Sequence, residues 1–314
     1  MWFGQRVLVI ANPSAGRGRA ATSLKLLRGM LRQGDRLVLT EHPRHAVELA
    51  REAARSGAWP VIAAAGGDGT AHEVACGVLE SENRETVLGV LPIGSANDYA
   101  WALKLGRDWW KRPGGATRVA TVDAGRLEWT GGDGKAGGTW FINGMGAGFN
   151  GQVTLESRKI RHLRGLPLYA LAVWRALGSH RMGGPWHVAV DGVALAERPR
   201  LTVSLALGPR EGNFVVAPEA SLTDGLFDAL AAEPLGVLEI LRLLPGLAVG
   251  AALRHPRVWQ GRGTVVEMRL AEGEAFIAHV DGELAVLPGM GVREMTARVV
   301  PGRLRVLAGG GFGG

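Results

Sequence analysis

The stretch Ala65-Gly66-Gly67-Asp68-Gly69-Thr70 decides the fold of the N-terminal part of this chain. It follows an apolar run over 59–64, typical of a buried parallel strand, and precedes a helical pattern over 70–79. A strand, a glycine turn and a helix present backbone N–H groups to a phosphate, and glycines let the phosphate approach closely. Thr70 and Glu73 have the spacing of a capping box, so a tight turn before a well-capped helix explains the stretch equally well.

Strands and helices alternate around this stretch. The patterns predict strands over 6–11, 37–40, 59–64 and 87–91, with helices over 20–31, 45–56 and 70–79. Such alternation predicts a doubly wound parallel α/β sheet, which binds ligands beyond the carboxyl ends of its strands. Four loops are expected to converge there: Asn12–Arg19, Thr40, Gly66–Thr70 and Gly94–Asp98.

The first of these loops carries two cations. Arg17 and Arg19 follow Gly16, and guanidinium groups can clamp phosphate oxygens with two hydrogen bonds. A helix N-terminus with solvated arginines is the alternative. The loop lacks the Gly-Lys-Ser/Thr ending of a P-loop and the G-x-G-x-x-G fingerprint.

The composition changes after residue 107. A linker is predicted over 109–115, then a hairpin of strands 119–129 and 139–142 with a flexible tip over 131–138, and a helical region opened by 143–150. The strands expected later, interrupted by one helix over 235–244, are 187–190, 201–207, 226–231, 264–270, 276–280, 284–287, 294–300 and 304–307. This pattern predicts an antiparallel sandwich or barrel. We therefore expect an α/β domain over 1–115 and a β-rich domain over 116–294, with a strand near 295–308 that can return to the first.

Two Asp-Gly pairs lie between apolar runs of the β-rich part. Asp191-Gly192 and Asp281-Gly282 each give the strongest local signal for a hairpin. The second pair continues into Glu283, which places two carboxylates on one tight turn. The pattern alone does not raise that turn above a plain hairpin.

Charge and composition limit the function classes. The 314 residues are 46% hydrophobic and 21% charged, which is an ordinary globular composition for two domains. The net charge of +7 favours anionic partners or serves solubility alone, and the basic residues show no aromatic-interleaved motif for nucleic acid. The single Cys76 excludes an intrachain disulfide and fits a reducing cytoplasm. No segment predicts a signal peptide or a bilayer span, and the basic run 158–164 suits either an anionic membrane surface or a solvated helix face.

Taken together, the loops resemble the diacylglycerol kinase catalytic domain family, which includes sphingosine kinases and bacterial soluble lipid kinases. The resemblance covers nearly the whole chain, with its motifs in the expected order: Asn12-Pro13-x-x-Gly16, Gly66-Gly67-Asp68-Gly69-Thr70, Pro92-x-Gly94-Ser95-x-Asn97-Asp98-x-Ala100 and Asp281-Gly282-Glu283. The glycine block alone is shared with NAD kinases. The Asn-Pro and Pro-x-Gly-x-x-Asn-Asp blocks favour the lipid kinases.

The resemblance implies a site between the two domains, with Mg²⁺-ATP as donor and a lipid hydroxyl as acceptor. On the matched positions, nucleotide-binding roles fall to Asn12, Gly16, Arg17, Thr40, Gly66, Gly67, Asp68, Gly69, Thr70, Ala71, His72, Gly94, Ser95, Asn97 and Asp98. A second Mg²⁺ site, catalytic or structural, falls to the carboxylate of Asp224 with the carbonyls of Ser221 and Leu226. His72 stands where the family usually has Asn, and Ser95 where it usually has Thr.

The mechanism expected from this resemblance is phosphoryl transfer, which needs positioning, charge neutralisation and a base. Asp68 with Mg²⁺ would offset phosphate charge, and Glu283 or Asp281 would take the proton of the lipid hydroxyl, most simply that of diacylglycerol. The protein would be cytoplasmic and peripheral at the inner membrane surface, and the oligomeric state stays open, a homodimer being one option. Two alternatives remain: an NAD kinase-like enzyme, and a nucleotide- or lipid-binding protein without turnover.

Overall fold

The chain divides into two compact units. The structure is a computed structural model, and it describes residues 4–15, 20–111, 117–160, 163, 165–179, 185–248 and 255–313. Unit 1 comprises residues 1–124 and 301–314, and unit 2 comprises residues 125–300. The sequence predicted the boundaries at 115 and 294. Two long strands, β5 (Thr117–Thr130) and β19 (Glu294–Gly309), have residues in both units.

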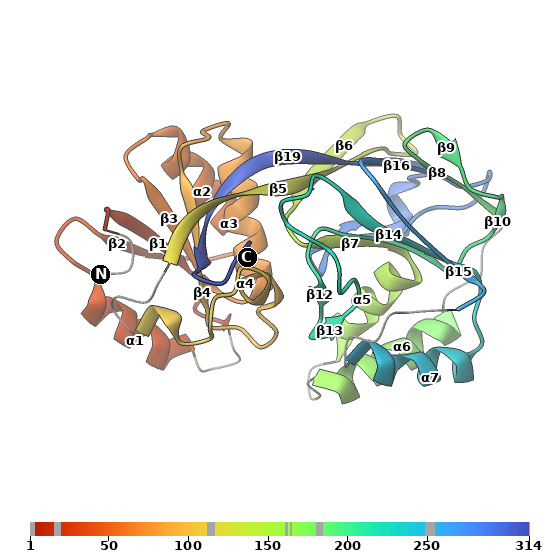
Figure 1. The fold of residues 1–314 in the computed structure, drawn as a ribbon, viewed down its shortest axis with the longest axis horizontal. Helices are drawn as coiled ribbons and strands as arrows, with labels where there is room; N and C mark the ends of the chain where they lie inside the picture. Colours follow the sequence, from red (N-terminus) through yellow and green to blue (C-terminus); the bar gives the residue numbers. More distant parts are fainter. Residues whose placement is uncertain are drawn as a thin grey trace. The chain divides into compact units, whose positions relative to one another are not determined.

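Unit 1 is built on a parallel sheet in the order β4-β3-β1-β2, as Figure 1 shows. Its strands are β1 (Val7–Ala11), β2 (Arg36–Leu39), β3 (Val61–Gly66) and β4 (Val87–Pro92), and residues 305–306 of β19 pair in parallel with β4. Its helices are α1 (Ala20–Met30), α2 (His45–Arg55), α3 (Asp68–Glu80), α4 (Asp98–Ala102) and the 3₁₀ turn η2 (Trp109–Lys111). The predicted parallel α/β architecture is confirmed.

Apolar strands explain this arrangement. All residues of β1, β3 and β4 are buried, as expected for strands covered on both faces. α2 and α3 pack closely at Gly77, where an added Cβ would lie 2.7 Å from the Cβ of Ala50. Trp110 is 1% exposed and Trp109 Nε1 donates to the carbonyl of Val90, so the start of the predicted linker belongs to the core.

Unit 2 contains a six-stranded antiparallel sheet in the order β15-β14-β11-β7-β17-β18. These strands are β7 (Gly144–Gly148), β11 (Thr202–Ala206), β14 (Phe227–Ala232), β15 (Val258–Gly263), β17 (Ala278–Val280) and β18 (Glu283–Val286). Figure 1 shows the helices α5 (Phe149–Lys159), α6 (Gly165–Ser179) and α7 (Val237–Ala248) gathered below this sheet. Their apolar residues form one cluster with Leu201 and Leu235.

A second group of strands completes unit 2. β16 (Val265–Arg269) pairs antiparallel with β8 (Pro185–Val190) and with residues 294–298 of β19, and β6 (Ala136–Phe141) pairs with residues 125–130 of β5. Short pieces add β9 (Val193–Ala194), β10 (Arg198–Pro199), β12 (Arg210–Glu211), β13 (Phe214–Val215) and the 3₁₀ turn η3 (Pro288–Met290). Phe141 of β6 stacks on Phe227 of β14 with ring centroids 5.7 Å apart, so aromatic contacts join the two groups of strands. The predicted antiparallel C-terminal domain is confirmed.

Three local predictions are wrong. Residues 144–148 form the central strand β7 rather than opening a helix, and the two strands predicted over 294–307 are one continuous strand, β19. α3 begins at Asp68 with Gly67 as its N-cap and no side-chain cap, so Thr70 lies inside the first turn. Glu73 Oε1 instead accepts the N–H of Arg44.

Within the described residues, no helix combines the length and the apolar character that crossing a membrane requires.

Candidate functional site

Two glycine loops touch at the carboxyl ends of β3 and β4 in unit 1. A Cβ added to Gly67 would lie 3.3 Å from the Cα of Gly94, and one added to Gly94 would lie 3.1 Å from the nitrogen of Gly67. The N–H groups of Ile93 and Gly94 both donate to the carbonyl of Gly66, at 2.8 and 3.0 Å. Backbone thus packs on backbone here, and the contact leaves no room for a side chain.

Asp68 ties these two loops together. Its Oδ2 accepts the N–H of Asn97 at 2.7 Å, and its Oδ1 accepts the N–H of Tyr99 at 3.2 Å. Burial raises the pKa of this carboxyl, while the N–H groups of Tyr99 and Asn97 act against that rise. Asp68 therefore holds the second loop, and the first turn of α4, against the start of α3.

Asn97 has the geometry of a ligand-facing residue in this pair of loops. Its backbone is left-handed (φ 55°), and its Nδ2 donates to the carbonyl of Gly94 at 3.0 Å. Its Oδ1 is buried without a hydrogen-bond partner among the described residues. Buried acceptors normally have partners, so a hydroxyl or an amine of a bound molecule fits this oxygen. The side-chain-free glycine contact and the first turn of α3 provide backbone suited to phosphate.

The remaining predicted nucleotide residues occupy different positions around these loops. Asn12 and Thr40 follow β1 and β2, and Asn12 Oδ1 accepts the N–H of Ser14 at 2.8 Å, which shapes the loop after β1. Ser95 is exposed at the tip of its loop, whereas Ala71, His72 and Asp98 are buried. The His72 ring lies beside Cys76, with Nε2 3.6 Å from Sγ. Gly16 and Arg17, and also Arg19, lie outside the described residues.

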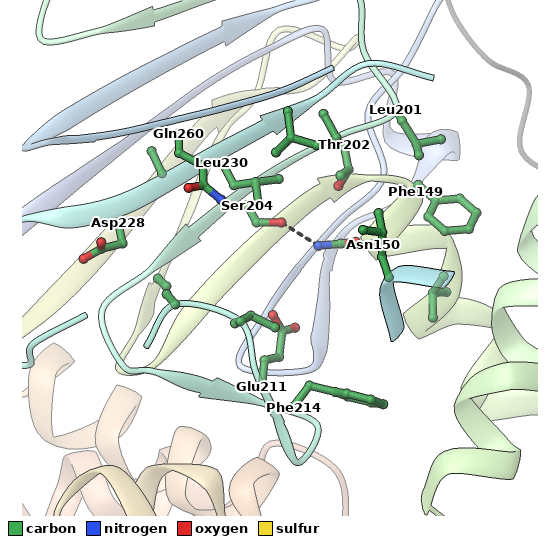
Figure 2. Close-up of a pocket in the computed structure, with 18 of the residues that line it drawn as sticks. Phe149, Asn150, Leu201, Thr202, Ser204, Glu211, Phe214, Asp228, Leu230 and Gln260 are labelled. Carbon is green, nitrogen blue, oxygen red and sulfur yellow. Dashed lines mark hydrogen bonds between the residues drawn. The ribbon is translucent and has the colours of Figure 1, made fainter. Parts of the chain in front are cut away.

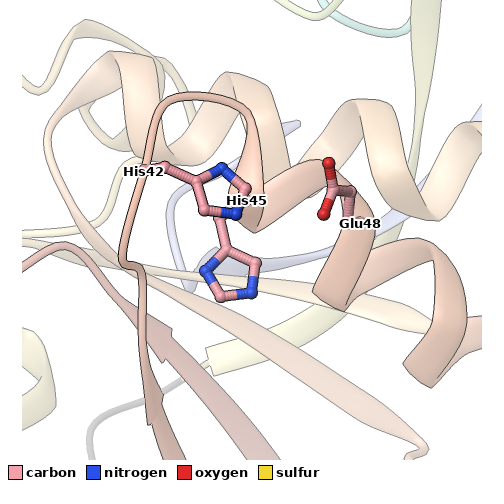
Figure 3. A group of neighbouring side chains, drawn as sticks. All are labelled: His42, His45 and Glu48. Atoms are coloured by element: carbon pink, nitrogen blue, oxygen red, sulfur yellow. The ribbon is translucent and has the colours of Figure 1, made fainter.

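A histidine pair follows Thr40 at the start of α2. Figure 3 shows His42 and His45 stacked, with ring centroids 4.4 Å apart and planes 10° apart, and Glu48 beside them. Glu41 N–H donates to His45 Nδ1 at 3.0 Å, so in the neutral ring the proton sits on Nε2 and would have to leave before that nitrogen could bind a metal. His42, His45 and Glu48 each offer one ligand atom within 4.8 Å of the others, and binding an ion there would require His45 to change its tautomer.

In unit 2, Asp281 has a structural position at the turn between β17 and β18. Its carboxylate accepts three backbone N–H groups at 2.8–3.0 Å, from Ile142, Asn143 and Gly144. Asp191, at the other Asp-Gly turn, likewise accepts backbone N–H groups of Thr264 and Val265. Thr264, whose hydroxyl also donates, lowers the pKa of Asp191. Both aspartates therefore fasten a hairpin turn to a neighbouring segment.

Glu283 differs from Asp281 in having an accessible carboxylate. Its side chain is 41% exposed and pairs with Arg158, in the last turn of α5. Arg158 also donates to the carbonyl of Gly282 at 3.3 Å, which holds the cation against this turn. Arg158 is the first residue of the basic run 158–164, and residues 161, 162 and 164 of that run lie outside the described residues.

The predicted metal turn contains oxygen donors of the right kind. Asp224 Oδ1 accepts the N–H of Leu226 at 3.1 Å, and Gly225 has a positive φ of 73°. Arg262 lies 3.9 Å from Asp224 and 3.1 Å from Asp228, which it binds more closely. One carboxylate with nearby carbonyls suits a hydrated Mg²⁺, because Mg²⁺ keeps several waters. The residues fit the ion by donor type, and Arg262 competes with it for Asp224.

A cavity of about 550 Å³ lies in unit 2 between the six-stranded sheet and the helices below it. Figure 2 shows polar side chains of β11, β14 and β15 on its sheet side, among them Ser204, Asp228 and Gln260. Phe149, Val153, Val173, Ile240 and Leu243 line it from α5, α6 and α7. The cavity therefore combines an apolar wall with a limited set of polar groups, as ligand sites commonly do.

The strand register shows that the two ends of the sheet beside this cavity differ in polarity. At one end of the sheet Ala206, Asp228 and Arg262 are neighbours, and the row continues through Gly144, whose carbonyl accepts the N–H of Asp281. At the other end the row contains Thr202, Ala232 and Val258, close to the apolar cluster of the helices. The polar end is thus the end at which the Asp281-Gly282-Glu283 turn lies.

Sequence reasoning missed two residues of this cavity. Glu211, on β12, and His279, on β17, both line it, and their side chains are 3.1 Å apart. A His two residues before a predicted Asp-Gly turn is a weak signal. Glu211 lies in a short hairpin that has no clear strand pattern.

The chain thus combines a parallel α/β unit, with two glycine loops at the carboxyl ends of its strands, and an antiparallel β unit. Residues 6–127 match the diacylglycerol kinase catalytic domain, and residues 143–308 match the YegS C-terminal NAD kinase beta sandwich-like domain. The second match alone covers more than half of the chain. The protein belongs to the family of diacylglycerol kinases and YegS-like lipid kinases, as the sequence motifs predicted.

Similar proteins agree with this assignment. The chain is 28% identical to a diacylglycerol kinase of Bacillus subtilis, over 91% of this chain and 92% of that protein. It is 36% identical to a YegS-like lipid kinase of Chromohalobacter salexigens, over 59% of this chain and 57% of that protein. A diacylglycerol kinase structure from Bacillus anthracis shares the fold with a TM-score of 0.66 at 18% identity, covering 97% of each chain. A yeast NADH kinase bound to NADH shares it with a TM-score of 0.52 at 9% identity, over 96% of this chain and 82% of that one.

Proposed function

We propose that this protein transfers the γ-phosphate of ATP, with Mg²⁺, to the hydroxyl of a lipid. On family grounds the simplest acceptor is diacylglycerol, which would give phosphatidic acid. The observation that carries the lipid assignment is the cavity of unit 2, which has an apolar wall and a polar end toward the end of the sheet that carries the Asp281-Gly282-Glu283 turn. A soluble nucleotide acceptor has no need of such a wall.

In unit 1 the proposed nucleotide site consists of the two touching glycine loops. Gly66 to Thr70 and Gly94 to Asp98 would place backbone N–H groups around the phosphates, and Asn97 Oδ1 would accept a ligand hydroxyl or amine. Mg²⁺, when bound with ATP, neutralises charge on the phosphate oxygens. Asp68 acts by fixing the two loops relative to each other, because both of its oxygens accept N–H groups of the second loop and the turn after it.

Glu283 is the better candidate for the base. The acceptor oxygen would attack the γ-phosphorus, the bond from that phosphorus to the ADP oxygen would break, and the hydroxyl proton would pass to the Glu283 carboxylate. The carboxylate of Asp281 already accepts three N–H groups, so using it as a base would weaken the turn that it holds. The ion pair with Arg158 holds the Glu283 carboxylate in place at this turn.

The helices below the cavity suit contact with a lipid surface. Trp174 on α6 is 65% exposed and Leu238 on α7 is 68% exposed. Arg175 and Arg242 are exposed on the same two helices. Apolar side chains beside cations are the combination that anionic membrane surfaces attract. We therefore place the protein in the cytoplasm, peripheral at the inner membrane surface, with α6 and α7 toward the lipid.

A phosphate-transfer screen tests the proposal. Purified protein with Mg²⁺ and γ-labelled ATP is offered mixed micelles of diacylglycerol, monoacylglycerol or sphingosine, with NAD in a separate aqueous reaction. We expect label in a lipid product, lost in Glu283→Gln and kept in Glu272→Gln, whose carboxylate belongs to a 95% exposed side chain. Label only in the NAD reaction would replace the proposal with an NAD kinase activity. ATP binding without any transfer would indicate a binding protein.

A further inference from the structure

A row of cavity residues crosses the six-stranded sheet one step inside its polar end. His279 on β17 and Ser204 on β11 both lie opposite Gly146 on β7, and the row continues through Leu230 to Gln260. This row is two residues along the strands from the row that contains Gly144, or about 6.5–7 Å. It is therefore the first row that a lipid would meet beyond the group that reacts.

Gly146 makes room for polar side chains above this row. A Cβ at Gly146 would lie 2.6 Å from His279 Nε2 and 2.7 Å from the Cβ of Asn150. Because that Cβ is absent, Asn150 reaches across and its Nδ2 donates to Ser204 Oγ at 2.6 Å, the contact drawn in Figure 2. One N–H of the Asn150 amide is thus used within the protein.

Glu211 faces this row from the β12–β13 hairpin. Figure 2 shows its side chain extending from the hairpin toward the sheet, beside Phe214. His279, which is 1% exposed, places Nε2 3.1 Å from Glu211 Oε1, while its Nδ1 has no hydrogen-bond partner among the described residues. This pattern fits an imidazole that carries its proton on Nε2 and donates it to the carboxylate. The Glu211 side chain itself is 24% exposed, so part of its accepting capacity faces the cavity.

We infer that Glu211, held by His279, selects an acceptor lipid that keeps a free hydroxyl or amino group next to the hydroxyl that receives phosphate. The inference rests on the proposed transfer to a lipid hydroxyl, and it favours an acceptor with a second donor over diacylglycerol. An ionised carboxylate only accepts hydrogen bonds, so a ligand that displaces its water must supply a donor. Diacylglycerol has a single donor, the reacting hydroxyl, and its two esters offer only acceptor oxygens to Glu211. A lipid with a second donor can give the proton of its reacting hydroxyl to Glu283 and donate a hydrogen bond from its second group to Glu211.

Glu211→Gln separates this role from packing. The replacement keeps the size of the side chain, and the Nε2–H of His279 directs the new amide oxygen toward itself. The amide NH₂ then faces the cavity, which changes that position from acceptor to donor. An ether oxygen and a hydroxyl both accept from NH₂, so the variant loses its preference for a second donor.

Two matched acceptors test the inference: 1-octylglycerol, with two free hydroxyls, and 1-octyl-2-O-methylglycerol, whose second hydroxyl is capped. Binding is measured by calorimetry and transfer by γ-labelled ATP, for wild type, Glu211→Gln, Glu211→Ala and the exposed control Glu267→Gln. We expect wild type and Glu267→Gln to prefer 1-octylglycerol about tenfold or more, as for a hydrogen bond to a charged group. In both Glu211 variants the ratio should fall to near one.

The outcomes separate the two proposals. A wild-type ratio near one, or an unchanged ratio in both Glu211 variants that melt as wild type does, would overturn the inference while leaving a lipid kinase in place. A Glu211-dependent binding preference without any transfer would support the inference and contradict the proposed function. Failure to bind either lipid would overturn the inference, and the proposed function would fall with it only if the diacylglycerol, monoacylglycerol and sphingosine reactions also gave no labelled lipid.

Discussion

Substituting Gly94 with alanine tests whether the two glycine loops of unit 1 form the nucleotide site. A Cβ at this position would lie 2.9 Å from Asn97 Oδ1 and 3.1 Å from the nitrogen of Gly67, and closer still to the Cα of Gly67. Ordinary contacts of carbon are about 3.5–4.0 Å, so one loop must move by about 1 Å. Most of what surrounds Gly94 is backbone, so the strain cannot be relieved by turning a side chain.

The displacement has two expected consequences. Overpacking of this kind costs about 1–3 kcal/mol in free energy of unfolding, so the melting temperature should fall by several degrees. The movement also separates the N–H groups that we propose for the phosphates, and we expect ATP affinity to fall at least about tenfold, since a misplacement of about 1 Å can cost two orders of magnitude in rate.

Calorimetric titration with Mg²⁺-ATP and thermal unfolding measure both effects. Gly106→Ala is the matched control, because nothing lies within 4 Å of its added Cβ, and it should behave as wild type. A Gly94→Ala protein that binds ATP as tightly as Gly106→Ala would refute the assignment of the nucleotide to this contact. A fall in melting temperature without a change in affinity would mean that the contact is structural alone.

Three further predictions follow from the carboxylates. Asp281→Asn replaces an oxygen that accepts N–H groups with an NH₂ donor, so it should lower the free energy of unfolding by about 1–3 kcal/mol. Glu283→Gln should leave the free energy of unfolding unchanged, and equal melting temperatures of the two variants would contradict this contrast. Burial raises the pKa of Asp68 above its ordinary 3.8, so its contribution to stability is full below 3.8 and is lost as pH rises through the folded pKa. The melting temperature of wild type relative to Asp68→Asn should therefore rise on acidification from neutral pH toward 3.8, and a constant difference would count against it. Asp224→Asn should reduce the rise in melting temperature that Mg²⁺ gives to the nucleotide-free protein, while ATP affinity stays unchanged. Thermal unfolding at increasing Mg²⁺ concentrations measures this effect.

The sequence predicted unit 1 well because its signals are local. Each buried strand there is a continuous apolar run followed by a glycine or polar loop, and parallel strands bring their carboxyl ends to one edge. The meeting of Gly67 with Gly94 was not predictable, since it depends on the spacing of two adjacent strands. The hydrogen bonds from Asn97 and Tyr99 to the two Asp68 oxygens were not predictable for the same reason.

Unit 2 was harder to predict because glycine has two uses there. Residues 144–148 contain three glycines and were predicted to open a helical region, yet they form a central strand of the six-stranded sheet. Their small size admits the side chains of neighbouring elements: Asn150 and His279 above Gly146, and Trp186 against Gly148. The same glycines that weaken the strand pattern therefore create the polar row of the cavity.

The two Asp-Gly turns have the same sequence pattern, and only the structure distinguishes their roles. Asp191 and Asp281 have left-handed backbones (φ 49° and 50°), and both carboxylates accept backbone N–H groups. Protonation of such a carboxylate would weaken the N–H bonds that it accepts, so an aspartate in this position mainly stabilises the turn. Only the second turn is followed by a glutamate, and that carboxylate pairs with Arg158 at the end of a helix whose first turn lines the cavity. We therefore propose Glu283, the carboxylate that the hairpin leaves accessible, as the base, and Asp281 as the residue that fixes the turn on which Glu283 lies.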